Sequence, residues 1–410
     1  MKSKNMFLII LTIVILFAFS SSAVAQPNIT GQAGILIDAE TGKVLWGHNE
    51  REQRAPASIT KLVTALIAIE VGNLQEEVTI SENATDTTGI IIWLNAGETK
   101  TLEDLIYAIM LTSANDAALA IAEHIGGGSV DDFVRMMNQR VRELGAHHTN
   151  FMNPTGLSAP GHYSTAYDIA LIMRVALENP TLKAIMGTQN RTWSGAVWQG
   201  NLSNTNNLLR QEMYEGSLGG KTGTTTEAGN CLVNAVDRDG MRLISVVLGS
   251  TPQAIWNDSI RILDYGYNNY HMLKLVGQGD EILQIDRSGR TVPVLAGQVG
   301  EYLVSINADV SPTRQLKIYD FSLPLREGDT IGSLEFILDG DVIESIELVA
   351  GTNVRRSITL VGTYVVVTLI FFGIIALILL LKAINTFRKR RNSIYVNRAR
   401  RSKYGDARMY

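Results

Sequence analysis

Residues 217–249 read SLGGKTGTTTEAGNCLVNAVDRDGMRLISVVLG, and this stretch decides the fold. It holds three runs with the composition of β-strands, at 218–226, 230–237 and 241–249. An Arg-Asp-Gly sequence joins the last two runs, and Asp-Gly between two such runs is a strong signal for a β-hairpin. The stretch therefore predicts neighbouring antiparallel strands.

The chain around this stretch adds one more hairpin and several helices. Residues 34–47 read as an apolar GILID, a turn and KVLW, which predicts a hairpin. Helical patterns occur at 58–71, beginning at Ser58, and at 103–125, 129–144, 165–178 and 258–269. The second of these is interrupted near residues 113–115, and the last predicts a helix that returns to the sheet. The fold class is therefore α+β, with an antiparallel sheet built from both ends of the domain and helices between.

A second domain follows. Residues 275–350 contain short alternating segments separated by Gly, Pro and Asp, such as YLVSI, SLEFIL and SIELVA. This pattern predicts a small all-β domain, with its boundary to the first domain, 26–274, near residue 275.

The N-terminus has the pattern of an export signal. Lys2 and Lys4 precede 14 uncharged, mostly apolar residues, and small residues in an A-x-A pattern end at Ala25. Residues 1–25 therefore predict a secretory signal peptide that is cleaved after Ala25. The alternative is an uncleaved anchor, for which the apolar stretch is short.

The C-terminus predicts a membrane span. Residues 357–381 are 25 uncharged residues, more than the roughly 20 that cross a bilayer as a helix. Residues 382–410 carry ten Lys or Arg and one acid, a net charge of +9. The positive-inside rule makes this segment a cytoplasmic tail, which explains its charge without a nucleic-acid partner. The remainder, 26–381, carries a net charge of −15 and is predicted to be an exported, acidic body.

Ser58-Ile59-Thr60-Lys61 is the one S-x-x-K sequence of the chain. On a helix, residues i and i+3 lie on the same side, so Lys61 can reach the Ser58 hydroxyl. The apolar residues that follow and the helix N-terminus both favour a neutral Lys61, which could accept a proton. A serine hydroxyl is a poor nucleophile without such a base. The pair is a candidate for nucleophilic catalysis, although an isolated S-x-x-K is usually a capping Ser with an unrelated Lys.

Two further short sequences fit this chemistry. Lys221-Thr222-Gly223 is the one K-T-G, on the first strand of the opening stretch, where Lys and Thr can bind a carboxylate and Gly admits a ligand close to the backbone. Within residues 26–356, S-x-N occurs three times, at 81–83, 113–115 and 305–307. Ser113-Ala114-Asn115 interrupts an apolar helical run, an odd place for polar residues, and is therefore the functional candidate.

Metal and redox chemistry find no support in the sequence. The six histidines show no metal-ligand spacing, and the single cysteine, Cys231, excludes an intramolecular disulfide. We therefore expect no metal and no cofactor, and we expect Cys231 to be a small packed side chain.

Taken in order, S-x-x-K, S-x-N and K-T-G resemble the signature of penicillin-binding proteins and class A β-lactamases. The flanking sequences APASITKLVTAL, LTSANDAALAIAEHIGG, NPTGL, STAYDIA and GGKTGTTTEAGNCLV look like the low-molecular-mass D-alanyl-D-alanine carboxypeptidases of bacteria. The resemblance covers about residues 30–350. It implies a penicillin-binding/β-lactamase-like domain, followed by the small all-β domain and one C-terminal transmembrane helix.

The resemblance also implies catalytic roles. Ser58 would attack the carbonyl between the last two D-alanines of a peptidoglycan stem pentapeptide, with Lys61 as its base. Ser113 would relay a proton to the leaving D-alanine, and Asn115 would orient Lys61 and bind the peptide backbone. Penicillin and other β-lactams would acylate Ser58 and remain attached.

Substrate-binding roles follow from the same resemblance. Lys221 and Thr222 would hold the terminal carboxylate, next to Gly223. The backbone N–H groups of Ser58 and Thr224 would form an oxyanion hole.

Two departures from the family qualify the resemblance. The family often carries an Arg in the loop that here reads STPQAIW (250–256), so substrate preference is expected to differ. It is also often attached by an amphipathic helix, whereas 357–381 has no polar face.

Three other functions remain as alternatives. A D,D-endopeptidase is not excluded by the sequence. A serine β-lactamase would need a deacylating Glu in an E-x-x-L-N loop, and none occurs between Ser113 and Lys221. A non-catalytic penicillin sensor or scaffold is disfavoured because all the catalytic positions are filled.

Overall fold

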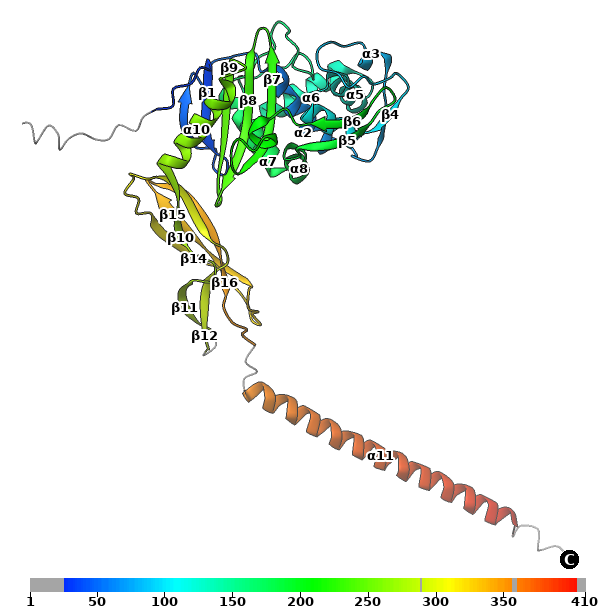
Figure 1. Cartoon of the computed structure of the whole chain (residues 1–410). Coiled ribbons are helices and arrows are strands. Elements are labelled where there is room, and N and C mark those ends of the chain that lie inside the picture. Colours follow the sequence, from blue (N-terminus) through cyan, green and yellow to red (C-terminus); the bar gives the residue numbers. More distant parts are fainter. Residues whose placement is uncertain (1–25, 288–289, 356–359, 404–410) are drawn as a thin grey trace, which may run out of the picture. The chain divides into compact units, whose positions relative to one another are not determined.

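The computed structural model describes residues 26–287, 290–355 and 360–403 (Figure 1). The chain divides into two compact units. One contains the residues up to Leu273 and Glu301–Val310, and the other contains Lys274–Gly300 and the residues from Ser311 onward. The predicted signal peptide, 1–25, lies outside the described residues.

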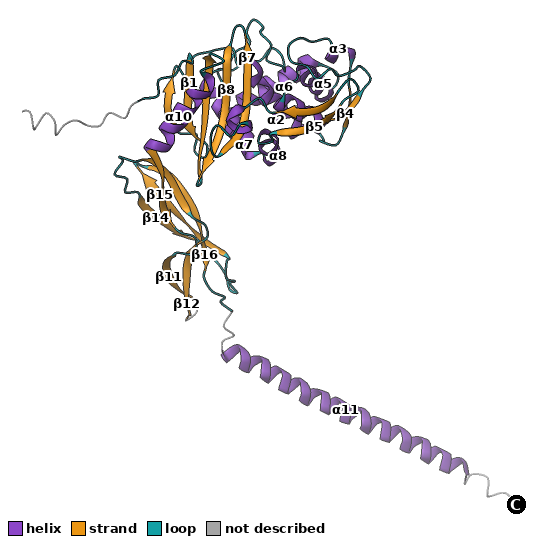
Figure 2. Cartoon of the chain, viewed as in Figure 1, coloured by secondary structure: helices purple, strands orange, loops and turns teal. Residues whose placement is uncertain are grey.

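A five-stranded antiparallel sheet forms the centre of the first unit, in the order β2-β1-β9-β8-β7 (Figure 2). Its strands are β1 (Ala33–Asp38), β2 (Val44–His48), β7 (Ser217–Thr225), β8 (Gly229–Arg238) and β9 (Met241–Ser250). The three strands predicted from 217–249 and the hairpin predicted at 34–47 are therefore confirmed. Gly34 of β1 lies opposite Val247 of β9, so both ends of the domain meet in one sheet, as predicted.

Separate hydrophobic cores cover the two faces of this sheet. Successive side chains of a strand point to opposite faces. Accordingly, Ile35 belongs to the core that contains residues of α2 (Lys61–Val71), α4 (Leu102–Leu111), α5 (Asn115–Ile125) and α7 (Ala166–Glu178). Its neighbour Leu36 belongs to the core that contains residues of α10 (Ile255–Asn269). Strand β8 is buried on both faces, which explains its almost continuous apolar sequence.

Eight further elements belong to the first unit. They are β3 (Glu77–Thr79), α3 (Glu82–Thr85), β4 (Thr99–Thr101), α6 (Val130–Glu143), α8 (Pro180–Met186), β5 (Asn190–Ser194), β6 (Gln199–Ser203) and α9 (Asn207–Arg210). The interruption predicted near 113–115 is confirmed, because α4 ends at Leu111 and α5 begins at Asn115. The helix predicted to begin at Ser58 differs at its start, where a 3₁₀ turn, Ala57–Thr60, precedes α2.

The second unit is rich in strands, as predicted for 275–350. Five antiparallel strands form a sheet in the order β11-β12-β16-β15-β14. Their bounds are β11 (Glu281–Arg287), β12 (Arg290–Ala296), β14 (Thr313–Ile318), β15 (Thr330–Leu338) and β16 (Asp341–Ala350). Two further strands, β10 (Tyr270–Val276) and β13 (Gly300–Ser305), form a two-stranded sheet, and most residues of each belong to the first unit. The inward residues of the larger sheet, such as Val294, Phe336 and Leu348, are buried.

A single long helix, α11 (Leu360–Lys403), ends the described part of the chain. Its segment Tyr364–Ile394 is long and apolar enough to cross a membrane, and it is the one such helix among the described residues. The predicted span 357–381 begins within residues that the structure does not describe. The helix does not stop at 381 but continues into the basic segment.

Candidate active site

The 3₁₀ turn Ala57–Thr60 carries Ser58 at the start of α2. Ala57 has a φ of +48°, in the left-handed region that residues other than glycine rarely adopt. Two glycines make room for the turn: a Cβ on Gly156 would lie 2.0 Å from the Ala57 carbonyl oxygen, and a Cβ on Gly223 would lie 2.9 Å from Ser58 N. The Thr60 hydroxyl donates to the same Ala57 oxygen at 2.8 Å. Close packing and this hydrogen bond therefore hold Ala57, the residue before Ser58, in an unusual backbone conformation.

Lys61 is fully buried, and its amine has three oxygen neighbours. Lys61 Nζ lies 3.2 Å from Ser58 Oγ, 2.6 Å from Asn115 Oδ1 and 2.6 Å from the carbonyl oxygen of Thr155. The Asn115 and Thr155 oxygens can only accept hydrogen bonds, so they take both N–H bonds of a neutral amine. The lone pair of that amine then faces the Ser58 hydroxyl, the one neighbour of the three that has a proton to give. This geometry permits proton transfer from Ser58 to Lys61.

The electrostatic surroundings favour the neutral amine. Burial lowers the pKa of Lys61 well below its ordinary value, and the positive charge of Lys221 lowers it further. The Asp116 carboxylate opposes both effects and raises the Lys61 pKa in part. Burial also lowers the pKa of Lys221, to about 7. The charged form of Lys221 is thus one of the two influences that keep Lys61 neutral, and burial is the larger one.

Ser113 and Asn115 lie where α4 gives way to α5. Ser113 has a φ of +69° and is 3% exposed, and its hydroxyl has no hydrogen-bond partner among the residues that the structure describes. Asn115 is fixed by two further bonds, from its backbone N–H to Ile90 O at 2.7 Å and from its side-chain amide to Thr88 O at 2.6 Å. The polar interruption of the helix thus presents an unpaired hydroxyl and an anchored amide.

Strand β7 supplies the K-T-G residues. Lys221 is 1% exposed, whereas Thr222, Gly223 and Thr224 line a cleft. Thr222 Oγ1 lies 2.6 Å from Thr205 Oγ1, and Thr224 Oγ1 donates to Asn230 Oδ1 at 3.0 Å. Because β7 is the last strand in the sheet order, one side of its backbone faces away from the sheet.

A cleft of about 230 Å³ brings these groups together. Its lining residues are Ser58, Ile90, Ser113, Thr205, Thr222, Gly223, Thr224, Asn230, Cys231, Ile255 and Trp256. Lys61 joins them through its contact with Ser58, and Lys221 lies between lining residues of β7 as a buried cation. A wider depression of about 650 Å³, between residues 26–28 and α10, contains none of the predicted residues. Of the eight predicted residues, five line this cleft, and Lys61, Asn115 and Lys221 are buried beside it.

Cys231 is 2% exposed, and burial raises its pKa to about 11, so it is a packed thiol, as expected. The described part of the chain contains no cluster of His, Cys, Asp and Glu that could hold a metal ion.

Several residues of this site were not predicted from the sequence. The Thr155 carbonyl oxygen, which accepts from Lys61, is a backbone atom, so the residue type does not predict its role. The Asn-Pro-Thr-Gly sequence around it indicates only an irregular loop. Thr205 lies 17 residues before its partner Thr222, in a polar run with no motif of its own. Ile90 and Trp256 line the cleft from opposite ends of the domain sequence, and only the fold joins them.

Comparison with known proteins agrees with this geometry. Residues 20–252 match the profile of the peptidase S11 family, described as D-alanyl-D-alanine carboxypeptidase. D-alanyl-D-alanine carboxypeptidase DacF of Bacillus subtilis is 32% identical over 344 residues, which are 78% of this chain and 87% of that protein. DacA of Haemophilus influenzae is 33% identical over 350 residues, 80% of this chain and 87% of that protein.

Solved structures show the same likeness. Penicillin-binding protein 5 from Haemophilus influenzae is 30% identical, with a TM-score of 0.62, over 82% of this chain and all of that one. The peptidoglycan synthesis regulatory factor PBP3 from Streptococcus pneumoniae is 28% identical, with a TM-score of 0.68, over 80% of this chain and all of that one.

Proposed function

Because the chain belongs to the D-alanyl-D-alanine carboxypeptidase family, peptidase S11, we propose that Ser58 is its nucleophile and Lys61 the base that activates it. The chain is a serine-type D-Ala-D-Ala carboxypeptidase of the penicillin-binding class, acting through an acyl-enzyme. The observation that carries the residue assignment is the buried Lys61 amine, 3.2 Å from Ser58 Oγ and saturated elsewhere by two acceptors.

Acylation proceeds from this pair. Ser58 Oγ attacks the carbonyl carbon between the last two D-alanines while its proton passes to Lys61 Nζ. The C–N bond then breaks, and the departing D-alanine amine takes a proton through Ser113, whose hydroxyl has no other partner among the described residues. Asn115 holds Lys61 in place throughout. Water hydrolyses the Ser58 ester and restores the enzyme.

Strand β7 and the 3₁₀ turn bind the substrate. Lys221 and Thr222 hold the terminal carboxylate of the peptide, with Gly223 leaving room beside Ser58. The backbone N–H groups of Ser58 and Thr224 stabilise the oxyanion, a contribution of about 3–4 kcal/mol per donor in other acyl-transfer enzymes. Support comes from the close approach of Gly223 to Ser58 N, which puts β7 against the nucleophile. The same groups accept a β-lactam, which carries a carboxylate next to a strained amide.

The domain assignment and the cellular placement belong to the same proposal. Residues 1–25 are a signal peptide, 26–274 the catalytic domain, 275–350 a β-domain that acts as a spacer, 357–381 the membrane span and 382–410 a cytoplasmic tail. The apolar helix at the C-terminus supports a membrane anchor. The basic residues that follow it support a cytoplasmic tail. Protease added to intact cells should leave an epitope on the tail intact, and its digestion would refute this orientation.

Two assays on the detergent-solubilised full chain test the activity and the roles. We expect release of D-alanine from a muramyl pentapeptide and a long-lived label from fluorescent penicillin, both abolished in Ser58→Ala. Lys61→Arg, whose guanidinium cannot lose its proton at ordinary pH, should lose at least about 100-fold in acylation rate, the lower end of what a general base contributes. Full activity in Lys61→Arg would exclude Lys61 as the base.

The same assays separate the alternatives. Rapid turnover of penicillin would indicate a β-lactamase, and label without D-alanine release would indicate a sensor. Cleavage of cross-linked dimers in preference to pentapeptide would indicate an endopeptidase.

A further inference from the structure

Asp116 is a buried carboxylate that the mechanism above does not use. It is the second residue of α5, directly after Asn115, and is 1% exposed. No ion pair that includes it is found in the described ranges. A buried carboxylate without a cationic partner is costly, and burial raises the pKa of Asp116.

Its partners are backbone N–H groups: Ala117 N, next to it in α5, and two groups of segment 88–94, of which Ile90 lines the cleft. The Asp116 carboxylate accepts from Ile92 N at 3.0 Å and from Leu94 N at 3.1 Å. Between these two residues Trp93 adopts a φ of +54°, so that both N–H groups turn toward the same carboxylate. A tryptophan in the left-handed region persists only where its surroundings fix it.

The neighbouring residue ties the same segment to the base. Asn115 donates to Thr88 O and Ile90 O, and accepts from Lys61. The first turn of α5 therefore holds segment 88–94 with two residues, one of which also holds Lys61. Ile90, in the middle of this segment, lines the cleft and is 54% exposed.

We propose that Asp116 is a positioning residue for the Ser58–Lys61 pair, and this proposal rests on the function assigned above. Its carboxylate fixes the cleft wall 88–94 against α5, and thereby fixes Asn115 against the Lys61 amine. Its negative charge also acts on the base, since Lys221 on β7 and Asp116 on α5 are the charged groups that act on Lys61 in the described structure. The two act in opposite directions, so Asp116 keeps Lys61 basic enough to take the proton of Ser58.

Asp116→Asn separates these effects from a structural role. The variant keeps the size and one acceptor oxygen of the side chain and removes its charge. With that charge gone, the pKa of Lys61 falls further, so the acid limb of the pH profile should move to lower pH. The profile to measure is the second-order rate of Ser58 acylation by fluorescent penicillin, which reports the free enzyme. We expect KM for the pentapeptide to rise as well, because the wall 88–94 is less well held.

Asp168→Asn is the matched control. Asp168 lies in the first turn of α7, is 1% exposed, and accepts from His148 N and Thr149 Oγ1, both at 2.7 Å. It resembles Asp116 in burial and bonding but is not among the groups that act on Lys61. Its variant should lower the melting temperature and leave the acid limb unchanged.

The outcomes are distinguishable. An unmoved acid limb in folded Asp116→Asn, or an equal shift in Asp168→Asn, overturns the positioning role while the carboxypeptidase assignment stands. If Asp116→Asn does not fold, Asp116→Glu replaces it, because it keeps the charge on a longer side chain. An unchanged acid limb together with a raised KM for the pentapeptide supports the proposal. An unchanged KM overturns it. Wild-type chain that penicillin does not label, or label that persists in Ser58→Ala, overturns both.

Discussion

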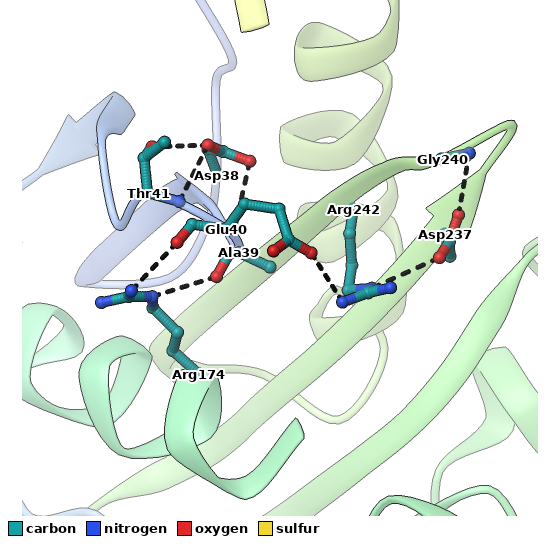
Figure 3. A network of polar contacts seen from close by, with 8 residues as sticks. All are labelled: Asp38, Ala39, Glu40, Thr41, Arg174, Asp237, Gly240 and Arg242. Carbon is teal, nitrogen blue, oxygen red and sulfur yellow. Dashed lines mark hydrogen bonds and ion pairs between the residues drawn. The ribbon is translucent and has the colours of Figure 1, made fainter. Parts of the chain in front are cut away.

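Two polar clusters of the first unit use similar side chains in opposite surroundings. In one, around the β1–β2 turn, Arg242 pairs with Glu40 at 2.7 Å and contacts Asp237 at 3.3 Å, while Arg174 donates to the carbonyl oxygens of Ala39 and Glu40 (Figure 3). The Arg242 and Glu40 side chains of this surface cluster are 29% and 60% exposed. The other, the buried lysine cluster, consists of Lys61, Lys221, Asn115 and Asp116, each at most 4% exposed.

The difference shows what burial does to a charge. Each cation of the surface cluster faces anions or carbonyl oxygens that satisfy it, and water screens what remains. In the buried cluster two lysines oppose one carboxylate, and desolvation displaces the pKa values of both amines. Charged groups therefore stabilise a turn at the surface, whereas burial beside the cleft favours the neutral form of the lysines.

Lys221→Met should break the buried cluster most severely. It removes the cation that we propose holds the terminal carboxylate of the substrate, and losing one partner of a buried charge pair costs about 2–5 kcal/mol, or roughly 30- to 4,000-fold in kcat/KM. The pKa of Lys221 is about 7, so the wild-type amine loses its charge as pH rises through that value. The ratio of wild-type to variant kcat/KM for the pentapeptide should therefore be largest near pH 6 and fall toward pH 9.

Loss of Lys221 has a second effect, which also makes the ratio of wild-type to variant kcat/KM larger at low pH. Without Lys221 the pKa of Lys61 rises, because the neighbouring positive charge that lowered it is gone. The acid limb of the variant should move to higher pH, opposite to Asp116→Asn. A ratio that is independent of pH would show that Lys221 does not act as a titrating cation.

Much of this fold could be predicted from the sequence, because short segments carry the pattern of the element that they form. Strand β8 shows as an apolar run because both its faces are buried, and the break between α4 and α5 shows because Ser-Ala-Asn interrupts an apolar pattern. The 3₁₀ turn that carries Ser58 could not be predicted. Its 3₁₀ geometry depends on Gly156 and Gly223, which approach from distant parts of the chain, and the S-x-x-K spacing reads equally well as a plain helix start.

The site was predictable to the extent that side chains carry it. The S-x-x-K, S-x-N and K-T-G sequences identify candidate residues by type and spacing alone. The structure places these residues in or beside one cleft. Sequence favoured a neutral Lys61 from its apolar flank, but the larger influence of Lys221 over Asp116 depends on burial and proximity. Asp116 itself reads as an ordinary acidic residue in the first turn of a helix.

His162 sharpens the comparison, because it is buried without a charged partner. Its Nε2 lies 2.9 Å from Thr60 Oγ1, and its Nδ1 accepts from Met152 N at 3.1 Å, so the neutral ring supports the turn that carries Ser58. Burial lowers the pKa of His162 to about 4. In the unfolded chain His162 binds a proton below about pH 6.5, whereas in the folded chain it binds one only below about pH 4. The free energy of unfolding should therefore fall as pH drops through this window, by up to about 3 kcal/mol.

His162→Gln tests this contribution. Thermal unfolding of the full chain in detergent, followed by tryptophan fluorescence from pH 4 to 7, should show a weaker pH dependence in His162→Gln than in wild type. His147→Gln, at an exposed position, is the control and should keep the wild-type dependence. Equal pH dependence in all three chains would contradict the buried, neutral state of His162.

The surface cluster should respond least. Arg242→Gln and Glu40→Gln each remove one partner of an exposed pair, and a double-mutant cycle with the double variant isolates their coupling. We expect a coupling of about 1 kcal/mol or less, decreasing as salt rises from 0.05 to 1 M, because exposed pairs gain little over hydration and are screened. Acylation of Ser58 by penicillin and its pH profile should not change. A salt-independent coupling above about 2 kcal/mol would mean that the Arg242–Glu40 pair behaves as a buried one. Exposure would then not be what separates the two clusters, and the shifted lysine pKa values would need a cause other than desolvation.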